Sequence, residues 1–204
     1  MSKIEINSLN ELINKGYPME YVQNIINNVL LLSLQVKEDY PDYKQWFLSK
    51  QVPGIYDGSR NIIVAHINDK IIGFASLKKG ETEKKICTFF VDEVFRKNKI
   101  GFLLTQKAIE WLEFEKPLIT IPLDKLGGFI KIAKKYDWSV TDIKDGLYRI
   151  NNPEVIVNGF IESINSEPVK IKQKSISRIW FFYCYNKFTN IFKFPNLRLK
   201  YKNK

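Results

Sequence analysis

Apolar side chains recur every three to four residues in the stretch that follows Pro18. The stripe consists of Val22, Ile25, Ile26, Val29 and Leu30. This spacing puts them on one face of a helix, and a proline is well tolerated in a helix's first turn. Pro41 can open a second short helix, which carries Trp46 and Phe47. Proline, glycine and aspartate then cluster at residues 53–58, so we expect a loop there.

The middle of the chain is rich in β-forming residues. Two such runs, at residues 61–67 and 71–77, are separated by the polar tripeptide at 68–70, an arrangement that predicts a β-hairpin. A polar turn at 80–84 leads into a third strand, expected at 85–91. This part of the chain is therefore expected to form a sheet.

The second half alternates between helical and extended patterns. A helix directly after the third strand is predicted by the spacing of Ile100, Leu103, Leu104, Ala108 and Trp111. A buried strand follows at 118–122, then a helix at 129–136, and then a strand pair at 138–151 that turns at Asp145 and Gly146. The order of elements predicts an α/β or α+β fold with helices packed on the faces of a sheet.

Composition excludes several classes of protein. The 204 residues are 45% hydrophobic and 26% charged, which excludes a disordered or collagen-like chain. No apolar stretch approaches the roughly 18 residues that span a bilayer, so an integral membrane protein is not expected. The first fifteen residues lack the layout of a secretory signal, and Cys87, Cys184 and the single His66 form no disulfide or metal pattern. A metal-free cytoplasmic protein is therefore expected.

The net charge of +10 belongs to one segment of the chain. Of the 32 lysines and arginines, ten follow residue 169, and the remaining 22 equal the 22 acidic residues, none of which follows Glu167. The ten are Lys170, Lys172, Lys174, Arg178, Lys187, Lys193, Arg198, Lys200, Lys202 and Lys204. We therefore expect one domain at 1–160 and a basic, aromatic-rich C-terminal extension at 161–204.

Residues 170–204 interleave these cations with aromatic rings, and three interpretations stay open. Cations that neutralise phosphates and rings that stack on unpaired bases are typical of a contact with RNA or single-stranded DNA. The same composition suits an anionic membrane surface. Alternatively, the rings pack on the body of the protein and leave the lysines in water.

The junction between the third strand and the next helix, at 91–104, carries the candidate chemistry. A helix that begins there presents free backbone N–H groups and the positive end of its dipole to an anion. Arg96, Lys97 and Lys99 add positive charge, and Gly101 removes a side chain where a diphosphate approaches the backbone. The junction therefore favours phosphate binding, and a solvated basic loop is the alternative.

The same residues carry a resemblance to a known family. Val91, Phe95, Arg96, Ile100, Gly101 and Leu104 resemble the acyl-CoA binding motif [Q/R]-x-x-G-x-[G/A] of the GNAT N-acetyltransferase superfamily. The order of elements from about residue 18 to 151 also resembles that fold, which implies a mixed, mostly antiparallel central sheet flanked by helices.

The resemblance implies acetyl-CoA as the acyl donor and assigns residues to it. The coenzyme's pyrophosphate would be held by the loop of Arg96, Lys97, Asn98, Lys99, Ile100 and Gly101. The backbone at Phe90 and Val91 would bind the pantetheine arm. Two positions depart from the family pattern, because Lys99 replaces the first glycine and Glu93 replaces a frequent proline.

The resemblance also implies a general acid. Family members often carry a tyrosine on the helix before the final strands, which protonates the departing thiolate. Alignment places Ala133 at that position, and Tyr136 is the nearest substitute. Asp92 and Glu93 are candidate general bases at the strand end, with solvated loop carboxylates as the alternative interpretation.

Two further residues are expected to be structural. Cys87 lies on the third strand with no histidine or basic neighbour placed to form a thiolate, so a buried apolar role is expected. His66 alternates with Ile62 and Val64 on one strand face, which predicts a hydrogen-bonded structural histidine.

The chain is therefore expected to be an N-acetyltransferase. Its acceptor is expected to be a small amine, a protein amine or an aminoacyl-tRNA, the last suggested by the basic segment. The alternative is a catalytically degenerate GNAT-like protein that contacts nucleic acid, RNA or tRNA, through residues 170–204.

Overall fold

The computed structural model of the chain describes residues 3–36, 39–149 and 152–161. The basic segment at 170–204, with its predicted nucleic-acid contact, lies outside the described residues, as does most of the expected extension at 161–204. Apart from Ile161, the described residues fall in the N-terminal domain expected at 1–160.

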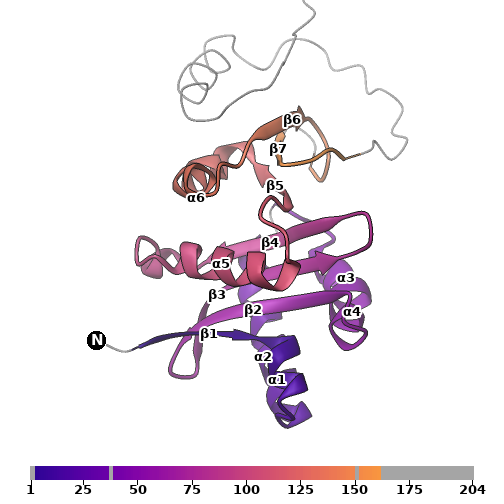
Figure 1. Cartoon of the computed structure of the whole chain (residues 1–204), viewed down its shortest axis with the longest axis vertical. Helices are drawn as coiled ribbons and strands as arrows, with labels where there is room; N and C mark the ends of the chain where they lie inside the picture. The colour runs from indigo at the N-terminus through magenta and orange to yellow at the C-terminus, as the bar shows by residue number, and fades with distance from the viewer. Residues whose placement is uncertain (1–2, 37–38, 150–151, 162–204) are drawn as a thin grey trace, which may run out of the picture.

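A seven-stranded sheet forms the centre of this domain (Figure 1). Its strands are β1 (Ile4–Ser8), β2 (Arg60–Ile67), β3 (Lys70–Lys79), β4 (Lys84–Val91), β5 (Leu118–Pro122), β6 (Val140–Lys144) and β7 (Glu154–Val157). They lie in the order β1-β2-β3-β4-β5-β7-β6, and every neighbouring pair is antiparallel except β4 and β5. The expectation of a mixed, mostly antiparallel sheet is confirmed.

Helices cover both faces of the sheet. One face carries α1 (Leu9–Asn14), α2 (Met19–Ser33), α3 (Tyr43–Trp46) and α4 (Val52–Tyr56), with a 3-10 turn at Leu34–Val36 and a π-helical turn at Phe47–Gln51. The other face carries α5 (Ile100–Leu112) and α6 (Ile130–Lys135), with 3-10 turns at Glu93–Phe95 and Leu123–Gly128. We call these the α1–α4 face and the α5–α6 face.

Burial on both faces explains why the strands are continuously apolar. Along β2, Ile63 and Ala65 belong to the buried cluster of the α5–α6 face, whereas Ile62 and Val64 belong to that of the α1–α4 face. Successive side chains of a strand point to opposite faces, so an unbroken apolar run is what a covered sheet requires. His66 follows a β-bulge, and its ring nitrogens lie 2.7 Å from Asn7 Nδ2 and 2.6 Å from the Asn68 carbonyl, which makes it a hydrogen-bonded structural histidine.

Three sequence expectations need correction. Neither β1 nor α1 was predicted, because each is too short to show a clear periodicity of apolar residues. Most of the loop expected at 53–58 is instead helix α4, because Pro53 stands in the helix's first turn, where its missing N–H is tolerated. The expected strand pair at 138–151 contains only β6. Its partner is β7, whose buried, β-branched Val155–Val157 run forms a better strand than the residues after Gly146.

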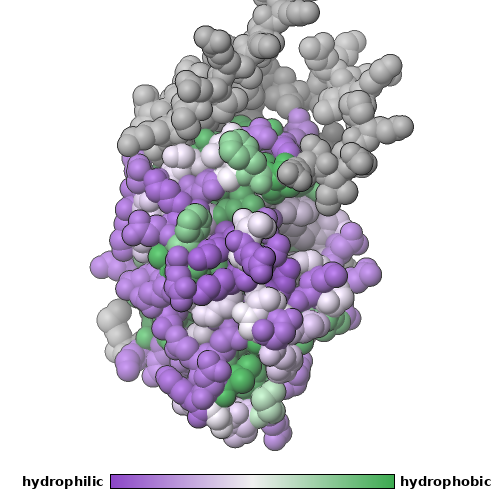
Figure 2. All heavy atoms as spheres, turned by 45° about the vertical axis from the view of Figure 1, so that its right-hand side comes forward, coloured by the Kyte–Doolittle hydropathy of each residue, from purple (hydrophilic) through white to green (hydrophobic). Residues whose placement is uncertain are grey.

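No helix within the described ranges is long and apolar enough to cross a membrane. On the face seen in Figure 2, hydrophilic side chains cover most of the described surface, and hydrophobic ones form separate small patches.

The start of α5 has an unusual backbone. Lys97 and Lys99 adopt left-handed conformations, with φ of 70° and 62°. Lys99, which replaces the family's glycine, is the N-cap residue of α5. A side chain in this conformation costs about 1 kcal/mol relative to glycine, so the turn accepts the lysine at a cost in stability.

We therefore expect Lys99→Gly to raise the free energy of unfolding by about 1 kcal/mol, because it removes this strain. Urea denaturation followed by circular dichroism measures the change. Lys131→Gly, at an exposed position within α6, is the matched control and should lower stability by a similar amount. A loss of stability in both variants would show that Lys99 is not strained.

Candidate active site

A β-bulge at Cys87 interrupts the middle of β4. Ser76 pairs with Thr88 but Leu77 pairs with Ile86, which leaves Cys87 as the extra residue on β4. The parallel pairing of β4 with β5 ends at the same place, because it contains only Lys85–Leu118 and Ile86–Ile119. A bulge bends its strand and terminates pairing, so β4 and β5 diverge beyond Ile86.

The divergence leaves one edge of β4 without a strand partner. The Asp92 amide donates to the Ile72 carbonyl of β3 at 2.9 Å. Because backbone groups alternate in direction along a strand, Phe90 also directs its amide and carbonyl at β3, whereas Val91 directs its own at the open edge. Consistent with this, the Val91 carbonyl accepts a 3.1 Å hydrogen bond from Arg96 Nε. Of the two residues expected at the pantetheine arm, Val91 has its backbone groups at the open edge.

The uncapped end of α5 lies just after this edge. Lys99 makes no side-chain hydrogen bond to the helix, and its carbonyl accepts from Phe102 and Leu103. Within the described residues, the amides of Ile100 and Gly101 have no protein acceptor. The anion-binding groups expected at this junction are therefore free.

The loop that leads into α5 is held by its own side chains. Asp92 accepts from the Val94 amide at 3.1 Å, and Glu93 lies 3.7 Å from Arg96 Nη1. Asn98 donates to the Phe95 carbonyl at 3.3 Å. These contacts give the two candidate bases, Asp92 and Glu93, a structural role in the turn.

Helix α6 forms the wall opposite the first turn of α5. A Cβ on Gly101 would lie 3.3 Å from Ile132 Cδ1, so a larger residue here would have to displace the Ile132 side chain. Tyr136 follows α6, packs against the same buried cluster, and has its ring 5.8 Å from that of Trp138. The structure thus places Val91, the α5 amides and Tyr136 on the α5–α6 face.

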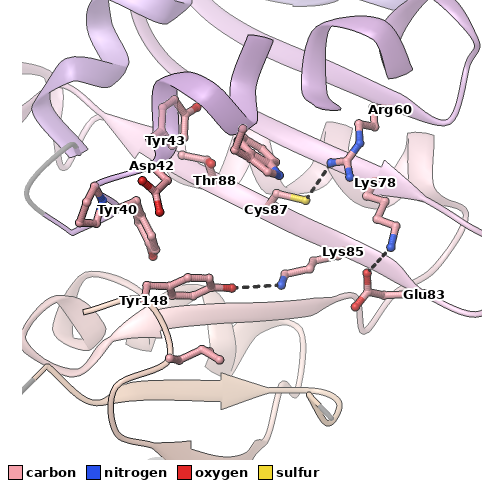
Figure 3. A pocket seen from close by; sticks show the side chains of 13 residues that line it. Tyr40, Asp42, Tyr43, Arg60, Lys78, Glu83, Lys85, Cys87, Thr88 and Tyr148 are labelled. Atoms are coloured by element: carbon pink, nitrogen blue, oxygen red, sulfur yellow. Dashed lines mark hydrogen bonds and ion pairs between the residues drawn. The ribbon is translucent and has the colours of Figure 1, made fainter. Parts of the chain in front are cut away.

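A pocket of about 390 Å³ lies against β4 on the opposite, α1–α4 face (Figure 3). Residues 40–46 and Arg60 form one side, β4 residues up to Cys87 and Thr88 form the base, and Leu147 and Tyr148 form the other side. The pocket therefore reaches β4 at the bulge, where the open edge begins. Sequence reasoning missed this pocket, apart from Cys87.

The surroundings of Cys87 differ in one respect from those expected. Arg60 Nη1 lies 3.7 Å from its Sγ, so the expectation that no basic residue lies nearby is wrong. Burial nevertheless raises the pKa of the Cys87 thiol, and the charges of Lys85 and Arg60 only partly oppose this. The thiol stays protonated at neutral pH, in keeping with a role other than that of a nucleophile.

A buried carboxyl, Glu154, lies beside the pocket. It is 1% exposed, and its Oε2 has no hydrogen-bond partner among the described residues. Burial, followed by the charges of Asp39 and Asp124, raises the pKa of Glu154 to about 8. Val155 and Val157 belong to the α5–α6 cluster, so alternation along β7 places Glu154 on the pocket face.

Glu154 interacts electrostatically with residues in and beside the pocket. Burial, followed by the charge of Glu154, raises the pKa of the pocket residue Tyr40, whose ring lies 5.1 Å from that of Tyr148. Asp39, also buried, is ion-paired with Lys125 and with Arg149 Nη2, the latter at 3.4 Å. Glu154 was not predicted as a site residue, because the last strand of the sheet was expected to end at residue 151.

Comparisons with known proteins identify one family. Residues 20–118 match the family model described as the acetyltransferase (GNAT) family. No curated protein matches the sequence.

Several solved structures are similar to this chain at low sequence identity. A protein of Desulfovibrio desulfuricans described as a GNAT-family acetyltransferase is 9% identical, with a TM-score of 0.50 over 76% of this chain and 97% of that one. The PaiA N-acetyltransferase of Thermoplasma acidophilum is 17% identical, with a TM-score of 0.49 over 78% and 99%. Nourseothricin acetyltransferase is 14% identical, with a TM-score of 0.44. The match covers 50% of this chain and only 65% of that protein.

The family match contains the bulged strand, the open edge and the start of α5, and the strand order agrees with the fold that the motif at 91–104 implied. Residues 20–118 therefore match a GNAT acetyltransferase domain, and the described residues have the fold of that family.

Proposed function

We propose that this chain is an N-acetyltransferase that transfers an acetyl group from acetyl-CoA to an amine. The observation that carries the proposal is the bulge at Cys87, where two accessible regions meet. On one face are the open edge of β4 and the free amides of α5. On the other is a pocket large enough for a small substrate.

The proposed coenzyme site uses the groups that the protein leaves unsatisfied. The amides of Ile100 and Gly101 bind the pyrophosphate, because a helix N-terminus favours negative charge. The side chains of Lys97 and Lys99 add positive charge beside them. Val91, with its backbone groups at the open edge, hydrogen-bonds the pantetheine arm. Acetyl-CoA supplies the acetyl group as an activated thioester.

The acceptor amine enters from the pocket and attacks the thioester carbonyl. A nitrogen–carbon bond forms and the carbon–sulfur bond breaks. Glu154 accepts the proton that the amine loses, since a base with a pKa of about 8 is matched to neutral or mildly alkaline pH. Tyr136, the one tyrosine among the described residues that packs on the α5–α6 cluster, protonates the departing thiolate.

The alternative of a degenerate binding protein is less well supported. Two departures from the family pattern favoured it, Lys99 in place of a glycine and the absence of the family's tyrosine at Ala133. The left-handed conformation accommodates Lys99 with the neighbouring amides still free, and Tyr136 packs on the same face as those amides. The predicted RNA contact lies outside the described residues and stays a prediction, as does a cytoplasmic location.

Isothermal titration calorimetry tests the coenzyme site. We expect acetyl-CoA to bind with a dissociation constant on the order of micromolar, and Gly101→Glu to weaken binding about 10-fold or more through charge repulsion and contact with Ile132. Gln106→Glu adds the same charge at an exposed position farther along α5 and should bind normally. No heat at millimolar acetyl-CoA, or equal effects of both variants, would refute the proposed site.

The pH dependence of turnover tests the two proton-transfer roles. Because Glu154 must lose its proton to act as a base, kcat/KM should rise with pH up to about 8. Glu154→Gln should lower the rate by about 100-fold and remove that rise, and Tyr136→Phe should slow turnover by about 10-fold. A rise that persists in Glu154→Gln would exclude Glu154, and an unchanged rate in Tyr136→Phe would exclude Tyr136.

Stability tests the ionisation of Glu154 independently of activity. Its pKa is raised in the folded state, so the folded protein holds a proton that the unfolded chain releases above pH 4.5. The free energy of unfolding should therefore fall by on the order of 3 kcal/mol between pH 5 and 8.

Glu154→Gln should remove most of this fall, and Glu115→Gln, at an exposed acid, should not. Urea unfolding at several pH values measures it. A parallel pH dependence in both variants would show that Glu154 ionises normally.

A further inference from the structure

The pocket on the α1–α4 face contains positive charge that the protein does not neutralise. Three cations line it: Arg60, Lys78 and Lys85. Lys78 is ion-paired with Glu83 at 2.8 Å. Among the described residues, Arg60 and Lys85 have no carboxylate within ion-pair distance. Two positive charges are therefore available to a ligand.

Arg60 is held in place by uncharged neighbours. Its Nη1 donates to Gln51 Oε1 at 3.3 Å, and Gln51, which is fully buried, donates to the Asn61 carbonyl at 2.8 Å. The guanidinium lies over the ring of Trp46, 5.5 Å from its centroid. Gly54 makes room for the side chain, since a Cβ there would lie 2.6 Å from Arg60 Cδ. The guanidinium is thus pre-positioned without an anion, so little side-chain entropy is lost when one binds.

Lys85 contributes its charge at the same end of the pocket. Its Nζ lies 3.5 Å from the Tyr148 hydroxyl. In Figure 3, Arg60 and Lys85 lie on the Cys87 side of the pocket, and Tyr40 and Asp42 lie on the other side. A carboxylate at this end would meet both of them.

An acidic side chain marks the other end of the pocket. Asp42 has no cation within ion-pair distance among the described residues. In Figure 3 its carboxylate points into the pocket between Tyr40 and Thr88, away from Arg60. The pocket therefore offers negative charge on the side of Thr88 and positive charge on the side of Arg60 and Lys85.

We propose that the acceptor is a small molecule that carries a carboxylate beside its amine, such as an amino acid or a short peptide. This rests on the proposed acetyltransferase function. Arg60 and Lys85 bind the carboxylate, and Asp42 attracts the ammonium to the part of β4 that borders the open edge. Polycationic amines are disfavoured because the same two cations repel them.

Initial rates of CoA release with acetyl-CoA and a panel of amines test the proposal. The panel contains the protein L-amino acids, their C-terminal amides, glycyl dipeptides, spermidine and kanamycin. We expect at least one amino acid or dipeptide to have a kcat/KM about 10-fold or more above that of its amide, because the amide lacks the charge that Arg60 binds. Faster turnover of spermidine or kanamycin would overturn the proposal.

A phosphate in place of the carboxylate is a separate outcome. β-Alanine and O-phosphoethanolamine present the two anions at similar distances from an amine. Turnover of β-alanine above O-phosphoethanolamine supports the carboxylate, and the reverse order overturns it.

Variants then locate the contact. Arg60→Gln and Lys85→Met should each raise KM for the carboxylate substrate about 10-fold and change KM for its amide less than about 2-fold. Lys84→Met is the matched control. Lys84 directly precedes Lys85 on β4, but its side chain extends toward the Glu113 carbonyl and the Phe114 ring, which do not line the pocket. Equal losses on substrate and amide, or an equal effect of Lys84→Met, would overturn the assignment.

The outcome is separable from that of the proposed function. If no amine is acetylated, calorimetry with CoA-saturated protein uses the same amino acids and amides. The pocket assignment is supported, even though the enzyme proposal fails, if an amino acid binds, its amide does not bind, and Arg60→Gln weakens the binding of the amino acid. No preference for the carboxylate overturns the assignment whether or not the protein is active.

Discussion

The arrangement of the site depends on one extra residue in β4. The bulge at Cys87 ends the pairing with β5 after two residue pairs, in the middle of a sheet that is otherwise continuous. A buried strand edge carries unpaired amides and carbonyls, which are costly to leave without a partner. At Val91 the carbonyl accepts a hydrogen bond from Arg96, but the amide at the open edge has no partner among the described residues. The free amides of α5 follow directly, so a ligand with matching acceptors satisfies both.

The same bulge explains why the two faces of the sheet cooperate. Strand β4 is covered by α5 and α6 on one face and bordered by the pocket on the other. Only where β4 and β5 separate can groups on the two faces approach each other. Glu154 lies on the pocket face at the start of β7, and its burial raises its pKa to about 8, so the carboxyl keeps a proton near neutral pH. A base of this kind is useful only where a substrate amine arrives, which is the role that the proposed function gives it.

Sequence patterns predicted the elements whose signals are local. The helical stripe after Pro18 became α2, the hairpin at 61–77 became β2 and β3, and the run at 100–111 became α5. The motif at 91–104 likewise contains its own information, since a strand end, a turn and a helix start lie within a few residues. The free amides at the start of α5 could therefore be predicted from the sequence alone.

The pocket could not be predicted in this way. Its residues come from several stretches that are distant in sequence. Arg60 gains its position from Gln51 and Gly54, and Gly54 lies in a segment that was expected to be a loop but forms α4. Glu154 was missed because the pairing of β7 with β5 is non-local, whereas the sequence reading favoured a local strand pair.

Amide hydrogen exchange with and without CoA tests the central claim most directly. If the bulge opens β4 to the coenzyme, saturating CoA should slow exchange at Val91, Ile100 and Gly101 by about 10-fold or more, while the amides that pair β1 with β2 keep their rates. Unchanged exchange at these three positions, in protein that calorimetry shows to be saturated with CoA, would contradict the account.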